Sequence, residues 1–164
     1  MAAYVAEPWS DLYVAMAGAA AALLGLLFVA VSINLEQVLR VSWLPLRAGE
    51  TLGVLVVLLA TAVFVLVPGQ SPTALGLELA GTGLVLIGAD GALRIRRGRP
   101  PGAPARSIVV PAVIVACTGV PLVLAGATLV AGDGGGLYWT VPALLAGFAG
   151  AVSNAWVLLV EILR

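Results

Sequence analysis

Apolar residues in this chain run in long blocks, and short segments with charges and turn residues separate the blocks. A helix needs roughly 20 apolar residues to cross the hydrocarbon core of a membrane, which is about 30 Å thick. By that measure the sequence predicts five spanning helices, at about residues 12–35, 50–67, 73–93, 108–131 and 138–163. We therefore expect an all-α integral membrane protein whose single transmembrane domain covers residues 1–164.

The third block is the weakest of the five, because Glu78 and Asp90 interrupt it. It is still needed as a span. Without it, the chain from Pro68 to Arg106 would stay on one side of the membrane, and the mostly apolar run 74–87 would lie in water.

The arginines predict the orientation of the helices. Five spans place Arg40 and Arg47 between the first and second helix, residues 94–106 with five arginines between the third and fourth, and Arg164 after the fifth. All eight arginines then lie on one side, and arginine in short loops marks the cytoplasmic side. We expect the N-terminus outside, the C-terminus inside, and a multi-pass protein of a bacterial cytoplasmic (inner) membrane.

The amino-acid composition excludes several kinds of metal site and catalytic site. The chain is 62% apolar and 10% charged, and it has no histidine and one cysteine. It cannot supply a zinc site of the usual ligands, an iron–sulfur cluster or an intrachain disulfide, and no nucleophile–base pair is visible. We expect no enzymatic activity, no metal and no cofactor. The arginines serve topology and contact with anionic lipid, so we expect no nucleic acid partner.

Small residues form a stripe along the first helix. Steps of three and four residues join Gly18, Ala22 and Gly25 to Ser32 and Glu36. Such a stripe is typical of a close helix–helix contact in a membrane. The alternative interpretation is that this face lines an aqueous path with Ser32, Asn34 and Glu36 at its inner mouth, because rings of acids in an oligomer select cations.

The fifth helix carries a comparable stripe in which Gly147 and Gly150 are packing candidates. It runs in the same direction as the first helix, which would allow the two to pack side by side. Asn154 lies on the same stripe. An amide at that depth is expected to make an interhelical hydrogen bond or, alternatively, to face a polar path.

Most of the acids in the spans lie close to the inner boundary. Asp90 and Arg94 are four residues apart, a spacing that suits an ion pair on one helix face. We expect an inner belt of salt bridges made of Arg47, Glu50, Asp90, Arg94 and Glu161. Glu78 differs, because it lies near the outer end without an arginine on that side, so it must reach water, accept hydrogen bonds or be protonated. It is a further candidate for a polar path.

Three segments carry a family resemblance: Gly18 to Leu35, Gly136-Leu-Tyr-Trp139, and the ending from Asn154 to Arg164. Together they resemble a family of small five-helix membrane proteins of actinobacteria, some of which carry the label modulator of FtsH protease. The resemblance implies a membrane-embedded fold and brings no catalytic residues. Usage rich in Ala, Val and Arg without Lys also fits a high-GC bacterium.

Two functions follow as hypotheses. One is a homo-oligomeric pore or channel-like protein, because five short helices are too few to enclose a solute path alone. The other is a non-catalytic partner or modulator that binds another membrane protein through its helix faces, because the short loops leave little else for recognition.

Overall fold

The computed structural model describes residues 2–98 and 105–162, and the regular structure in these ranges is helical. Its helices are α1 (Ser10–Ile33), α2 (Leu35–Arg40), α3 (Leu44–Leu66), α4 (Pro72–Arg97), α5 (Arg106–Ala131) and α6 (Thr140–Ile162). Three short 3₁₀ turns accompany them: η1 (Ala2–Tyr4), η2 (Glu7–Trp9) and η3 (Gly136–Trp139).

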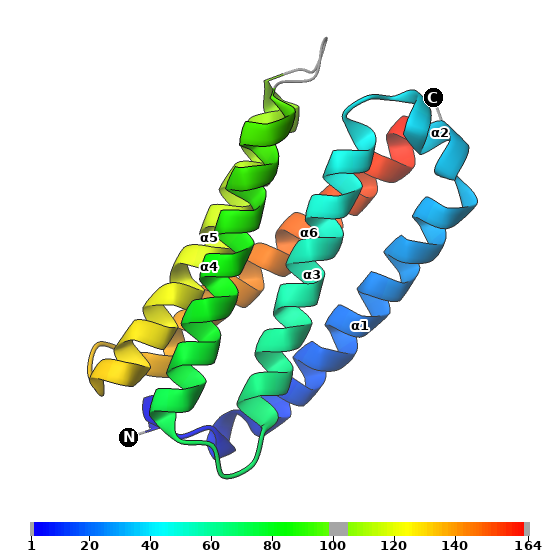
Figure 1. The fold of residues 1–164 in the computed structure, drawn as a ribbon. Helices are drawn as coiled ribbons and strands as arrows, with labels where there is room; N and C mark the ends of the chain where they lie inside the picture. The colour runs from blue at the N-terminus through cyan, green and yellow to red at the C-terminus, as the bar shows by residue number, and fades with distance from the viewer. Residues whose placement is uncertain (1, 99–104, 163–164) are drawn as a thin grey trace.

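Five of the helices are long and apolar enough to cross a membrane, which confirms the predicted number of candidate spans and supports a multi-pass membrane protein. They run up and down in an elongated bundle (Figure 1). This topology brings together the end of α1, the start of α3, the end of α4 and the start of α5, which we name the Arg-bearing end. The opposite end, formed by residues 2–10, 67–71 and 132–139, contains no arginine and is named the Arg-free end.

Two predicted boundaries were wrong. The second spanning helix begins at Leu44 and not near residue 50, because Pro45 lies in its first turn, where a residue without an N–H breaks no helical hydrogen bond. The first helix ends at Ile33 and does not continue to residue 35. Asn34 leaves the helical conformation there, and the chain resumes as the short α2.

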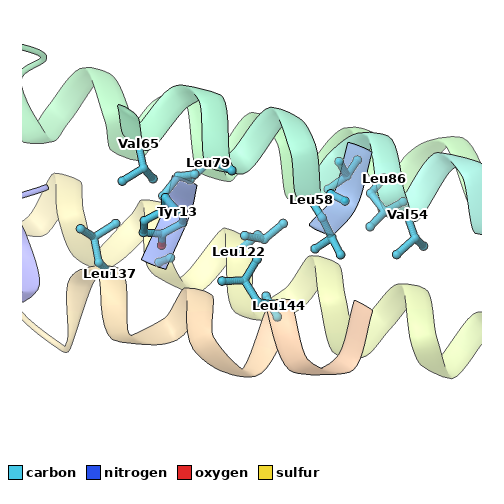
Figure 2. Close-up of a cluster of buried hydrophobic side chains, with 14 of the residues drawn as sticks. Tyr13, Val54, Leu58, Val65, Leu79, Leu86, Leu122, Leu137 and Leu144 are labelled. Carbon is cyan, nitrogen blue, oxygen red and sulfur yellow. The ribbon is translucent and has the colours of Figure 1, made fainter. Parts of the chain in front are cut away.

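The core lies among α3, α4, α5 and α6 (Figure 2). Leu58, Leu79, Leu122 and Leu144 each come from a different one of these helices and are at most 4% exposed. These side chains fill the centre of the bundle in the described part of the chain. The centre of the bundle is therefore a packed apolar core.

α1 lies at the edge of this bundle. It packs mainly along α3, and not side by side with α6 as the sequence suggested. Its buried residues are Tyr13, Ala20 and Leu27, which follow one another at seven-residue intervals on one face. Tyr13 also reaches α6, where its hydroxyl lies 2.5 Å from Oγ1 of Thr140.

The closest helix pair is α4 and α5, and we did not predict this pairing from the sequence. A Cβ added to Gly83 would lie 2.6 Å from the carbonyl oxygen of Gly119, and one added to Gly76 would lie 2.8 Å from that of Gly126. Two glycines on each helix, seven residues apart, thus let the two backbones approach.

The predicted packing role of the glycines in α6 is consistent with the structure. A Cβ on Gly147 would lie 2.9 Å from the side chain of Leu58 in α3, and one on Gly150 would press against Ile114 in α5. Both glycines therefore lie where α6 meets its neighbours.

Candidate functional site

Two groups of charged and amide side chains lie inside the spans at the Arg-bearing end, and the first group joins α3 to α6. Nε and Nη2 of Arg47 both donate to Oδ1 of Asn154, at 3.2 and 2.9 Å. Both residues are buried, and the guanidinium also lies 5.9 Å from the ring centre of Trp43. Asn154 thus makes the interhelical hydrogen bond that was one of its two predicted roles.

The second group joins α3, α4 and α5 through Arg94. Its Nε donates to Asp90 at 2.6 Å, its Nη2 to Glu50 at 2.7 Å, and its Nη1 to the carbonyl oxygen of Ile108 at 3.0 Å. The side chain of Glu50 is 6% exposed and that of Asp90 is 11% exposed. One guanidinium therefore ties three helices together at the level where the spans begin and end.

Four of the five residues predicted for the inner belt lie in these two groups. The expected pair of Asp90 and Arg94 is present. The pair of Glu50 with Arg94 joins two helices and was not predicted. Together, Arg47, Glu50, Asp90 and Arg94 contain two cations and two anions, so the cluster can be electrically neutral. The side chain of Glu161, the remaining predicted member, lies outside the described residues.

The predicted mouth of a polar path lies at the junction of α1 and α2. Ser32 is exposed, and Nδ2 of Asn34 donates to the carbonyl oxygen of Ala30 in its own helix at 2.9 Å. Glu36 is exposed and pairs with Arg40 of the same chain at 2.7 Å. Its carboxylate therefore already has a partner in the single copy.

Glu78 lies near the Arg-free end of α4, far from the other predicted polar residues. Its carboxylate accepts a hydrogen bond of 2.5 Å from Nε2 of Gln70, in the turn between α3 and α4. Glu78 therefore accepts a hydrogen bond, which is one of the three states that we expected for this acid. Gln70 itself was missed, although its place in the Pro68-Gly-Gln turn opposite the first turns of α4 could have marked it.

The five candidates for a polar path are thus not brought together within one copy. Ser32, Asn34 and Glu36 share one junction, whereas Asn154 is inside the bundle and Glu78 is near its other end. The described residues also contain no group of three or more acids or cysteines placed to hold a metal ion. The buried side chains of Arg47 and Asn154, and the pair of Arg94 with Glu50, connect helices.

The stripe of small residues on α1 faces away from the bundle. A Cβ added to Gly18 or to Gly25 would meet nothing within 4 Å, and Ala22 is exposed. Tyr13, Ala20 and Leu27, which pack on the bundle, lie on the opposite side of the helix. We call this outward stripe, from Ala15 to Gly25, the α1 face. Its predicted helix contact is not made inside the chain and stays a prediction about a second molecule.

Comparison with protein-family models, with curated proteins and with solved structures gave no match. The resemblance to the small actinobacterial membrane proteins therefore stays a prediction.

Proposed function

We propose that this chain is a non-catalytic membrane protein that works by binding another membrane protein through the α1 face. The observation that carries the proposal is the position of Gly18, Ala22 and Gly25. They form the face of α1 that has the smallest side chains. This face touches no other part of the described chain.

Small residues have a specific effect in a membrane. Lipid tails are as apolar as the helix surface, so helices associate through close packing and backbone contacts and not through the hydrophobic effect. The chain already contains two such close contacts between its own helices, one between Gly76 and Gly126 and one between Gly83 and Gly119. The partner best suited to the α1 face is a transmembrane helix that also carries small residues at steps of three or four.

The rest of the fold supports a binding role. α3 to α6 form a packed core, and Arg94 and Arg47 tie these helices together at one end. α1 packs mainly on α3, so most of its surface remains available. A rigid four-helix core would hold α1 in a fixed orientation, and a helix that is fixed before binding loses less entropy when it binds.

A homo-oligomeric pore is the second candidate. Ser32 and Glu36 are exposed at the end of the same helix, so symmetric copies joined near α1 would repeat both groups around an axis. The ion pair between Glu36 and Arg40 weighs against it, because the carboxylate needs no other cation. We therefore rank the pore below the binding role. A Glu36→Gln variant should reduce cation flux into liposomes if the pore exists, and should leave it unchanged if it does not.

A matched pair of substitutions on α1 tests the proposal. Gly25→Leu adds bulk to the α1 face without a clash inside the chain, whereas Leu27→Ala opens a cavity in the core. We expect Gly25→Leu to lower the fraction of the protein in larger complexes, measured by mass in polymer discs cut from the membrane, with an unchanged melting temperature. Leu27→Ala should lower the melting temperature and leave complex formation in the folded fraction intact.

The proposal fails if Gly25→Leu forms the same complexes as the unmodified chain. It also fails if the unmodified chain is found alone in discs taken from its native membrane.

A further inference from the structure

A cavity of about 420 Å³ lies at the Arg-free end of the bundle, between the N-terminal segment, the end of α3 and the start of α4. Figure 1 shows that the N-terminal segment and the turn between α3 and α4 meet at this end. The lining is mostly apolar with a few polar side chains, and includes Val65, Leu66, Leu75, Glu7, Ser10 and Gln70. Its size and lining are typical of a site for a small amphipathic ligand.

The polar side of this cavity is rich in hydrogen-bond acceptors. α3 ends at Leu66, and a helix leaves its last carbonyl groups without helical donors. Of these carbonyls, that of Phe64 accepts from the N–H of Val67. Pro68, which follows and also lines the cavity, has no N–H to offer them. The carboxylate of Glu7 adds a negative charge, and the C-terminal end of a helix favours a cation. The cavity therefore suits a cation that carries several N–H donors.

No cationic side chain of the described chain fills this role. The segments at this end contain no arginine, and the whole sequence has no lysine or histidine. Glu78 accepts its hydrogen bond from the neutral Gln70, and Glu7 makes no ion pair with any described residue. A cation that pairs with Glu7 would therefore come from outside the described residues.

The position of the cavity favours a lipid over a soluble amine. It lies at the end of the spans, where the headgroups of a bilayer are found. Val65 and Leu66 of α3 form its apolar wall, and Val67, which also lines it, is 44% exposed. An acyl chain that passes the exposed Val67 would leave its headgroup at the cavity, where Glu7 lies.

We infer that this cavity binds the ammonium headgroup of a phospholipid of the phosphatidylethanolamine type. The ammonium group donates to the carboxylate of Glu7 and to the free carbonyls at the end of α3. The choline headgroup has a similar charge but no N–H, and phosphatidylglycerol has no cation. The site is at the Arg-free end, so this inference does not depend on binding through the α1 face.

Lipid retention tests this inference. The full chain is placed in nanodiscs with equal amounts of phosphatidylethanolamine, phosphatidylcholine and phosphatidylglycerol of identical acyl chains, and the lipids that stay bound are counted by native mass spectrometry. We expect phosphatidylethanolamine to be retained about fivefold or more over each of the others, as a charge-assisted hydrogen bond would give. Glu7→Gln should remove this preference, and Glu7→Lys should shift it toward phosphatidylglycerol.

Asp133→Asn is the matched control, because Asp133 is an exposed acid at the same end but outside the cavity. It should retain the preference of the unmodified chain. Equal retention of the three lipids by the unmodified chain overturns the inference. A preference that survives in Glu7→Gln, or one that Asp133→Asn loses to the same degree, overturns it as well.

Discussion

The guanidinium of Arg47, in the first turn of α3, donates two hydrogen bonds to a single oxygen of Asn154, which lies 107 residues further along the chain in α6. The contact is buried and connects the start of one span to the last third of another. An arginine at this depth is costly unless its donors are satisfied, so Asn154 is placed to stabilise it.

The first prediction concerns this contact. Asn154→Leu removes the acceptor and leaves the buried guanidinium with fewer partners, which should cost about 2–3 kcal/mol of stability. Ser153→Ala is the control, because the neighbouring hydroxyl is exposed and bonds to the carbonyl oxygen of Ala149 in its own helix. Unfolding in detergent should separate the two variants, and equal stabilities would show that the Asn154 contact contributes nothing.

The second prediction compares two arginines. Arg94→Met leaves the buried Glu50 and Asp90 without their shared cation, and breaking a buried ion pair costs about 3–5 kcal/mol. Arg40→Met breaks an exposed pair with Glu36 and should cost less than about 1 kcal/mol. The same unfolding measurement applies. If Arg94→Met is as mild as Arg40→Met, Arg94 does not hold α3, α4 and α5 together.

The third prediction concerns the pairing of α4 with α5. A methyl group on Gly126 would lie 2.6 Å from Cβ of Ala80, so Gly126→Ala should force the helices apart and cost about 1–3 kcal/mol. Gly81→Ala meets nothing within 4 Å and should be neutral or slightly stabilising. The measurement is the melting temperature of both variants. A Gly126→Ala chain as stable as Gly81→Ala would contradict the close contact between α4 and α5.

The fourth prediction is the orientation in the membrane. Single cysteines are introduced at Asp133 and at Arg96, both exposed and at opposite ends of the bundle, with Cys117 replaced by alanine. An impermeant thiol reagent added to intact cells should label position 133 and spare position 96. The reverse pattern would place the Arg-bearing end outside and would contradict the expectation that arginine marks the cytoplasmic side.

The number of spans was predictable because it follows from the lengths of the apolar blocks and the turn residues between them. The contact of Asp90 with Arg94 was predictable for a related reason, since a spacing of four residues fixes the relative position of two side chains on one helix. Both predictions depend on information within one helix or one loop.

Contacts between helices were harder to predict from the sequence. Gly76, Gly83, Gly119 and Gly126 show the seven-residue spacing in the sequence, but nothing in a single chain pairs one helix with another. The stripe at Gly18, Ala22 and Gly25 has the same pattern and meets no part of the described chain. Spacing identifies a surface that suits close packing, and the arrangement of the helices decides whether that surface is used internally.

The partner of Glu50 was not predicted because it lies on another helix. Arg47 and Glu50 are three residues apart on α3, a spacing that places them on one helix face. The carboxylate of Glu50 nevertheless pairs with Arg94 of α4, and the guanidinium of Arg47 donates to Asn154 of α6. The spacing within one helix gives the face, and the arrangement of the helices decides the partner.

The most direct test of binding through the α1 face is site-specific photocross-linking in the native membrane. A photoreactive amino acid replaces Ala22 on the α1 face or Phe28, which is also exposed but points to one side of it. We predict a discrete cross-linked protein product from position 22 that is absent from position 28, and its mass tells whether the partner is a second copy or another protein. Cross-links to lipid alone at position 22, or the same products from both positions, would contradict the proposal.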